Sequence, residues 1–518
     1  MAAQRSDVLI VGGGHNGLTA AVLLARRGLS VTVLEQRDAL GGAAVTERPF
    51  AKAPNLGGST GAYLLGLMAP ELLEMLELDV KLKRRDPHYF LPTTGEEYLL
   101  FGSDERELER QFKAFFSEAD WRANQALNAE IAAIREDLAP AWLLPPLSLE
   151  ATADRFIRPA LQRQFVDLCR GTARQYLERF GFESDLVKAM YAVTDGFSGV
   201  DGGYDTPGTG FNFLAHNMCR LPDAGGTWMI VEGGMGALTQ AMARKARQLG
   251  ATLRTGATVK QVLVERGAAT GVVLESGETL RAHAVVINAD PFRGLGLFAP
   301  GALPEDYVGR IEAMRTPGTS LKVNLALSGL PVFSCLPENK GQFGPTIHLL
   351  PDEKVVLKEL DRAYQDAKAG RLADFPSIEW YIHTTVDPSL RDEEGRHNSA
   401  LFVEWVPYAL SGGKSWAQEE DRYVKHLLSI CDRFAPGFSD LVVDTFALTP
   451  PKIERHFGIT GGHIQHVDNT RGFDKRVPYA LPVPGAYFCS VGCHPAGGVS
   501  GAAGHNAANL VLEALGKA

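Results

Sequence analysis

The sequence predicts an α/β protein with two domains. One is built on a parallel sheet extended by an antiparallel meander, and the other is an α+β domain of mixed sheet and helices. An apolar run, a glycine-rich turn and a helical stretch follow one another over residues 7–28, as in a strand–turn–helix unit of a parallel sheet. Short alternating runs between residues 251 and 288 are typical of a meander. Helical periodicity over residues 104–190 and strand-like runs over about 300–450 indicate the second domain.

The composition excludes several classes of protein. The chain has 518 residues, of which 45% are apolar and 22% charged, as in ordinary globular proteins. Its net charge of −9 argues against a nucleic-acid partner, because neutralising phosphates requires a basic surface. Six cysteines without a C-x-x-C pair favour a reducing, cytoplasmic environment. No apolar run approaches the roughly 18 residues that span a bilayer. A first strand near Asp7 leaves no room for a leader peptide.

The first strand, turn and helix carry a dinucleotide-binding motif. Glycines at the G-x-G-x-x-G spacing follow the strand and open the helix, and an acidic residue ends the next strand. The first glycine allows a tight turn, the second lets a pyrophosphate approach the backbone, and the third allows close packing of helix and strand. Free N–H groups at the helix start favour an anion, and the carboxylate suits a ribose diol rather than the 2′-phosphate of NADP. The predicted contacts are Gly12, Gly14, His15, Asn16, Gly17 and Glu35.

A second glycine pair distinguishes an FAD site from a plain NAD site. Gln36-Arg37 follow the acid, and Gly41-Gly42-Ala43 come a few residues later. With this pattern the sequence resembles the phytoene desaturase-like branch of the flavin amine oxidase superfamily. The resemblance implies a Rossmann-like domain that binds FAD non-covalently, and it adds these five residues to the cofactor site. Ala43 stands where many members have an arginine that neutralises the pyrophosphate, so Arg37 is expected to carry more of that charge.

The resemblance extends to the middle and the end of the chain. Val259 matches the position whose backbone contacts the adenine, and Asn288 begins the family's strand-end motif. Near the C-terminus the chain keeps the family's Gly492, His494-Pro495 and Gly498-Val499, while Ala496 replaces one glycine. Together with residues 500–508, this motif is most similar to the subgroup called pyridine nucleotide-disulphide oxidoreductase domain-containing protein 2. No second G-x-G-x-x-G occurs over 300–450, which argues against a disulfide reductase. The resemblance assigns Val259, Asn288, Gly492, Gly498 and Val499 to the FAD site.

These motifs predict a discontinuous FAD-binding domain of residues 1–70, 220–295 and 470–518. The substrate domain would then comprise residues 71–219, mainly helical, and residues 296–469, rich in strands. An apolar, proline-broken segment at 141–147 is expected to be a lid over an apolar pocket, a shallow membrane contact or a buried connection between helices.

Few residues are expected to take part in chemistry, because a flavin accepts a hydride at N5 when the substrate C–H is held against it. His494 is the first catalytic candidate, since the family motif places it beside the flavin ring. The alternative is that His494-Pro495 only shapes the turn. Glu232 and His216 belong to a glycine-dense stretch expected to line the pocket, and either could equally be structural.

Covalent and metal chemistry have less support. Cys493 could form a thioether with the flavin, but a small packed thiol is the preferred interpretation. His463 and His466 lack nearby cysteines, so no metal site is predicted.

The leading hypothesis is an FAD-dependent oxidoreductase that dehydrogenates or isomerises C–C bonds. Its substrate would be a hydrophobic small molecule, with carotenoids and other isoprenoids as candidates, and its electron acceptor oxygen or a quinone. We expect a cytoplasmic protein, with peripheral membrane contact as an alternative, and the sequence leaves the oligomeric state open. An amine or amino-acid oxidase is the second hypothesis. The third is a non-catalytic binding protein resembling Rab GDP-dissociation inhibitors; the Gly41-Gly42 pair and the 492–499 motif argue against it, because both serve the flavin.

Overall fold

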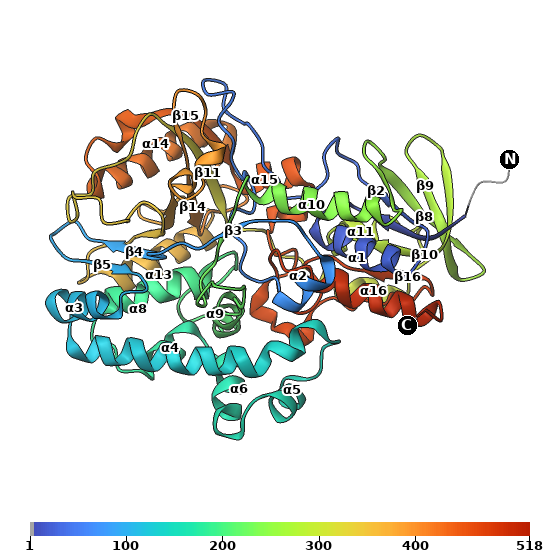
Figure 1. Cartoon of the computed structure of the whole chain (residues 1–518), viewed down its shortest axis with the longest axis horizontal. Helices are drawn as coiled ribbons and strands as arrows, with labels where there is room; N and C mark the ends of the chain where they lie inside the picture. Colours follow the sequence, from blue (N-terminus) through green and yellow to red (C-terminus); the bar gives the residue numbers. More distant parts are fainter. Residues whose placement is uncertain (1–4, 518) are drawn as a thin grey trace.

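The computed structural model describes residues 5–517 and contains two seven-stranded sheets (Figure 1). In the first sheet the strand order is β7-β2-β1-β10-β9-β8, and β16 also pairs with β10. The parallel strands are β7 (Thr252–Arg254), β2 (Val31–Leu34), β1 (Ser6–Val11), β10 (Thr279–Ile287) and β16 (Ala486–Phe488). β8 (Val259–Glu265), β9 (Ala268–Leu274) and the start of β10 form an antiparallel meander. The predicted α/β class is confirmed.

Three helices pack beside this sheet. α1 (His15–Arg26) contacts both α10 (Met235–Gln248) and α16 (Ala502–Ala514), and Figure 1 shows them together at one end of the molecule. Val8, Leu9 and Ile10 of β1 are fully buried, as expected for a central strand covered on both faces. Because this sheet combines strands from three distant parts of the chain, the residues at the ends of neighbouring strands are far apart in the sequence.

The second sheet has the order β15-β11-β14-β13-β12-β4-β5. Its strands are β15 (Val442–Leu448), β11 (Leu321–Leu327), β14 (His397–Glu404), β13 (Ser377–Tyr381), β12 (Thr346–Leu349), β4 (Tyr89–Pro92) and β5 (Tyr98–Phe101). β12 and β4 pair in parallel and all other neighbours are antiparallel. β4 and β5 come from a part of the chain in which the sequence suggested no strand.

The two faces of the second sheet differ in chemistry. Leu321 and Val323 of β11, with Ile378 and Trp380 of β13, point into an apolar core shared with α14 (Trp416–Phe434). Side chains at the intervening positions point to the opposite face, because successive residues of a strand alternate. That second face is equally buried but carries polar groups, and it forms part of the site described below.

Residues 104–190 are largely helical, as predicted. The helices are α3 (Glu105–Phe115), α4 (Glu118–Leu138), α5 (Leu149–Phe156), α6 (Gln162–Arg170), α7 (Ala173–Glu178) and α8 (Asp185–Tyr191), followed by α9 (Thr209–His216). Side chains of Asp104, Ser117, Ser148, Thr172 and Ser184 accept hydrogen bonds from first-turn N–H groups and fix where α3, α4, α5, α7 and α8 begin. In the 141–147 segment Trp142 is buried, whereas Leu144 is 38% exposed.

The remaining elements connect these layers. The helices are α2 (Pro70–Leu76), α11 (Pro291–Leu295), α12 (Glu305–Glu312), α13 (Val356–Lys368) and α15 (Pro450–Phe457). β3 (Leu82–Lys83) and β6 (Ile230–Val231) form a short antiparallel pair. None of the helices within residues 5–517 has both the length and the apolar character needed to cross a bilayer. The assignment of these regions to an FAD domain and a substrate domain remains a prediction.

Candidate FAD and substrate site

A cavity of about 570 Å³ is lined by residues of both sheets. One section is formed by the turn after β1, the end of β2 and the C-terminal motif, and another by the polar face of the second sheet. Of the predicted cofactor residues, Gly17 and Gly492 do not line the cavity. Those that do are Gly12, Gly14, His15, Asn16, Glu35, Gln36, Arg37, Gly41, Gly42, Ala43, Val259, Asn288, Gly498 and Val499.

The turn between β1 and α1 is shaped for close approach of a ligand to the backbone. Gly12 has a φ of +101°, which a side chain would disfavour. A Cβ at Gly14 would lie 3.0 Å from Asn288 Nδ2, and one at Gly17 would lie 2.3 Å from the Gly12 carbonyl oxygen. Gly17 thus allows α1 to pack against the turn without facing the cavity. No side chain caps α1 and its first turn has no acidic residue, so its N–H groups are available to a phosphate.

Glu35 is held at the end of β2 by two backbone donors. Its Oε2 accepts the Gly13 N–H at 2.7 Å and its Oε1 accepts the Arg37 N–H at 2.9 Å. Because each carboxylate oxygen can accept more than one hydrogen bond, both retain acceptor capacity toward the cavity. A buried, oriented carboxylate of this kind suits a ribose diol.

Arg37 is engaged within the protein and does not present a free charge. Its Nη2 lies 3.0 Å from Glu47 Oε1, and its Nη1 donates to the Gly42 carbonyl oxygen at 3.0 Å. Burial would raise the pKa of Glu47, but hydrogen bonds from His456 and Thr60 and the nearby charges lower that pKa to about 2. Arg37 therefore fixes the Gly41–Gly42 turn and shares its charge with an ionised Glu47.

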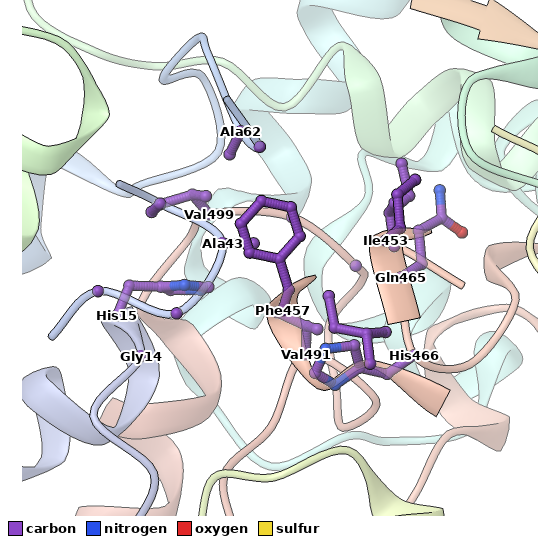
Figure 2. A pocket seen from close by; sticks show the side chains of 18 of the residues that line it. Gly14, His15, Ala43, Ala62, Ile453, Phe457, Gln465, His466, Val491 and Val499 are labelled. Atoms are coloured by element: carbon purple, nitrogen blue, oxygen red, sulfur yellow. The ribbon is translucent and has the colours of Figure 1, made fainter. Parts of the chain in front are cut away.

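The C-terminal motif lines the same section of the cavity. Figure 2 shows His15, Ala43 and Val499 on one side and Gln465 and His466 on the other, with the Phe457 ring between them. Buried Arg476 organises the surrounding loops. Its guanidinium donates to the carbonyl oxygens of Cys493, Val491, Val467 and Gln465 and to Asn469 Oδ1.

In the dinucleotide section of this cavity, two polar atoms lack partners within the described part of the chain. They are Nε2 of His15 and Nδ1 of His466. Burial lowers the pKa of His15 to about 4 and that of His466 to about 3, so both rings are neutral at physiological pH. The site therefore offers unpartnered imidazole nitrogens, an uncapped helix start, and glycine positions at which a side chain would not fit. These features together fit FAD, a polar dinucleotide with a pyrophosphate and a flavin ring.

An aromatic section follows along the cavity wall. The Ala62 N–H donates to the Ala43 carbonyl oxygen, which joins this section to the glycine turn. The next residue, Tyr63, has its ring centroid 4.6 Å from that of Tyr381 and 5.9 Å from that of Phe402. Trp228 contributes a further wall. Apolar and aromatic surface therefore continues directly from the dinucleotide end.

Three charged residues outside the dinucleotide-binding sheet were not predicted but also line the cavity. Arg85, Lys322 and Glu379 are each at most 4% exposed. Glu379 Oε2 accepts a hydrogen bond from the Tyr381 hydroxyl, whereas its Oε1 has no partner among residues 5–517. Burial raises the pKa of Glu379 to about 6. A usable signal was present in the sequence: Lys322 and Glu379 each stand between two apolar residues of a strand.

Among the predicted catalytic residues only His216 lines the cavity. Its Nδ1 lies 4.0 Å from Asp195 Oδ1, and its ring centroid lies 5.1 Å from that of Trp228. Burial lowers the pKa of His216 to about 4 and raises that of Asp195 to about 8. A neutral imidazole thus faces the cavity.

Glu232 and His494 lie elsewhere, which corrects the expectation that they line this pocket. Glu232 follows β6, whose pairing with β3 places its carboxylate 3.0 Å from Lys83 Nζ and 3.5 Å from Lys81 Nζ. The ring nitrogens of His494 lie 3.3 Å from the carbonyl oxygens of Phe473 and Ala141. His494 lines a separate cavity of about 230 Å³ together with residues of the 141–147 segment. These contacts agree with the alternative that His494 shapes its turn.

The histidine pair and the cysteines considered in the sequence have other surroundings in the described residues. Residues 5–517 contain no group of three or more His, Cys, Asp or Glu side chains arranged to hold a metal. His463 instead lies 3.3 Å from Asp468. All six cysteines are buried free thiols, and Cys493 does not line the cavity.

Comparison with known proteins identifies the family. Residues 17–365 match the family of flavin containing amine oxidoreductases. The chain is 35% identical to pyridine nucleotide-disulfide oxidoreductase domain-containing protein 2 of Mus musculus, over 98% of this chain and 94% of that protein. It is 26% identical to hydroxyneurosporene desaturase of Cereibacter sphaeroides, over 98% of each chain.

The fold comparison agrees. The structure of putrescine oxidase bound to putrescine matches with a TM-score of 0.61 and 18% identity over 99% of each chain, which shows a shared fold. The family match, the full-length similarity and the dinucleotide site together establish that this chain belongs to the flavin containing amine oxidoreductases and is an FAD-dependent oxidoreductase.

Proposed function

We propose that the protein is a dehydrogenase that removes hydrogen from a C–C bond of a largely apolar small molecule. The observation that carries this proposal is the single cavity in which the dinucleotide section continues into walls formed by Tyr63, Phe402 and Trp228. An apolar substrate gains free energy by leaving water for such walls. The similarity to a carotenoid-type desaturase supports the choice of a C–C bond.

The residues of the chain bind and orient the substrate and exclude water. FAD, when bound, supplies the two-electron acceptor. Dehydrogenation also releases a proton, and two side chains on the cavity wall can hold it: His216 at a ring nitrogen and Glu379 at Oε1. Glu379 is the better suited, because a carboxylate with a pKa of about 6 is ionised at neutral pH and binds a proton without a large penalty.

Amine oxidation is the second candidate, and Glu379 is also the observation that favours it. An ionised carboxylate beside the Tyr63–Tyr381 pair could bind an alkylammonium group through charge and cation–π attraction. The family to which the chain belongs takes its name from that chemistry.

Anaerobic reduction of the bound flavin distinguishes the two candidates. The FAD-loaded protein is mixed with polyenes, terpenes, amines and hydroxy compounds while the flavin absorption is followed. Bleaching by an unsaturated apolar compound, with a product lighter by two hydrogen atoms, is expected. Turnover to an isomer without bleaching would indicate isomerisation, and bleaching by amines alone would overturn the proposal.

A pair of variants tests the proton acceptor. Glu379→Gln should slow bleaching by roughly a hundredfold while FAD content is unchanged, since positioned general bases contribute about that much. Glu275→Gln, at an exposed position, is the matched control and should behave as wild type.

A further inference from the structure

Arg85 is a buried cation without an acidic partner. It is 2% exposed, lines the cavity, and forms no ion pair with a carboxylate of residues 5–517. Burial lowers the pKa of Arg85, but an arginine stays charged in proteins. Glu379 influences the charge of Arg85 without forming an ion pair with it, so the guanidinium keeps room for a directly bonded anionic partner.

Comparison with Arg476 shows that the hydrogen bonds of Arg85 are incomplete. Arg476 is also buried and forms no ion pair within residues 5–517, but each of its three nitrogen atoms donates to oxygen atoms of the protein. Arg85 donates from Nε to the Trp228 carbonyl oxygen at 2.9 Å, and from Nη1 to Thr346 Oγ1 at 2.8 Å and to the His88 carbonyl oxygen at 3.4 Å. Its Nη2 has no acceptor in the part of the chain that the structure describes. Two N–H donors therefore remain for a ligand.

The register of the second sheet places Arg85 away from the dinucleotide section. Lys322 of β11 pairs with Phe402 of β14, Phe402 pairs with Glu379 of β13, and Glu379 pairs with His348 of β12. β11 and β12 are therefore three strand spacings apart, which corresponds to about 14 Å. Lys322 contacts the 59–61 segment beside the glycine turn, whereas Arg85 is bonded to Thr346 on β12. Arg85 therefore lies at the end of the cavity wall opposite the FAD motifs.

We propose that Arg85 binds a carboxylate of the substrate, so that the substrate is an apolar molecule with a carboxylate at one end. The inference rests on the proposed function in taking this cavity as the substrate site. The two free N–H groups of Nη2 can donate charge-assisted hydrogen bonds to a carboxylate, and the Thr346 hydroxyl can donate its own hydrogen to the same group. The apolar body would then extend past Tyr381 and Phe402 toward the dinucleotide section.

Glu379 supplies an opposing effect that makes the site testable. Its unpartnered Oε1 is buried in the same section of the cavity, and the charges of Glu379 and Arg85 influence each other. At pH 8 this carboxylate is ionised and repels a bound anion. Removing its charge should tighten carboxylate binding, and removing that of Arg85 should weaken it. Simple loss of packing would weaken binding in both variants.

Calorimetric titration of the FAD-loaded full chain at pH 8 tests the proposal with octanoate, octanol and 2-aminooctanoate. Octanoate should bind about tenfold or more tightly than octanol, as a charge-assisted pair implies. Arg85→Gln should abolish that preference, and Glu379→Gln should strengthen it. Arg84→Gln removes the neighbouring, exposed arginine and should leave it unchanged. If wild type binds 2-aminooctanoate more tightly than octanoate and Glu379→Gln does not, the carboxylate belongs to an amino acid. Otherwise it belongs to a simple acid.

Two results would overturn the carboxylate site: equal affinity of wild type for octanoate and octanol, or wild-type octanoate affinity in Arg85→Gln. Because Arg85 also ties Trp228 to Thr346, the variant could lose its fold, and the ligand preference of wild type and of Glu379→Gln then decides. Octanoate binding without flavin bleaching by any unsaturated apolar compound would refute the proposed dehydrogenation but support the carboxylate site. Bleaching by apolar compounds without octanoate binding would support the dehydrogenation but refute the carboxylate site.

Discussion

Lys322 of β11 lies against the ring of Tyr63, with its Nζ 4.2 Å from the ring centroid and 2.8 Å from the Gly61 carbonyl oxygen. The same ammonium group donates to the Ser59 carbonyl oxygen. Burial lowers the pKa of Lys322 well below its ordinary value. One side chain of the second sheet thus fixes the segment that joins the glycine turn to the aromatic section.

Lys322→Met should therefore destabilise the protein. The carbonyl oxygens of Ser59 and Gly61 would lose buried donors, each at a cost of about 1–3 kcal/mol. Urea denaturation measures the free energy of unfolding, and Lys340→Met at an exposed position provides the control. An unfolding free energy equal to that of wild type would show that water replaces the ammonium group without loss.

Glu35→Gln should weaken FAD binding about tenfold or more, since hydrogen bonds to a charged acceptor contribute about 1.5–3 kcal/mol. The carboxylate accepts N–H groups from Gly13 and Arg37 on its two oxygens, whereas an amide offers only one acceptor atom. One backbone donor would face an NH2 group, and the side chain would turn away from the ribose. Reconstitution of the apoprotein, followed by flavin fluorescence, measures the affinity. Asp38→Asn, at an exposed neighbour, should bind FAD as wild type does; equal loss in both would point to a general effect of charge.

The FAD end of the site could be predicted because its chemistry is local in the sequence. The turn after β1 needs glycine where φ is positive or where a Cβ would strike the backbone, as at Gly12 and Gly17. Such requirements leave the same residue types at fixed spacing in any chain that folds this way. Gly17, which serves packing, shares one spacing with Gly12 and Gly14, which line the cavity, so the pattern does not separate it from the ligand contacts.

The substrate end could be predicted only poorly, because its residues meet through strand pairing. Glu379, Phe402 and Lys322 are neighbours by register, although they are far apart along the chain. Arg85 comes from a segment with no predicted element. A polar residue within an apolar strand indicates a buried polar face, but it does not reveal which other strands contribute to that face. His494 was misplaced for a related reason, since a motif position gives no direction for the side chain.

Asp195 should make stability depend on pH. Burial raises the pKa of Asp195 to about 8, against a hydrogen bond from Asn217 that lowers it. The titratable groups that interact with its charge are His216, Glu379, Tyr89 and Tyr191. Because the folded state favours the protonated carboxyl, its stabilising contribution is complete below the ordinary pKa of about 4 and is lost as pH rises toward 8.

The free energy of unfolding should decrease between pH 5 and pH 9, and in Asp195→Asn this decrease should be smaller than in wild type by at least about 1 kcal/mol. Glu379 and Glu404 have raised pKa values too, so some decline should remain. Urea denaturation at both pH values, with the exposed Asp223→Asn as control, checks this. An unchanged slope would mean that Asp195 is ionised in the folded protein.

Arg476→Lys should lower both stability and FAD retention, although it preserves the charge. The guanidinium of Arg476 reaches the carbonyl oxygens of Cys493, Val491 and Val467 and the side chain of Asn469. An ammonium group has three donors on one atom and cannot span acceptors that surround a planar fork. Leaving at least two of these buried oxygens unpaired should cost about 2–6 kcal/mol. The C-terminal motif would then lose its support beside Val499, and FAD should be released during gel filtration.

Arg471→Lys, whose arginine makes a single exposed hydrogen bond to the Ala313 carbonyl oxygen, is the matched control and should retain FAD. Loss of stability without loss of FAD would separate the two roles and show that the flavin end tolerates movement of these loops.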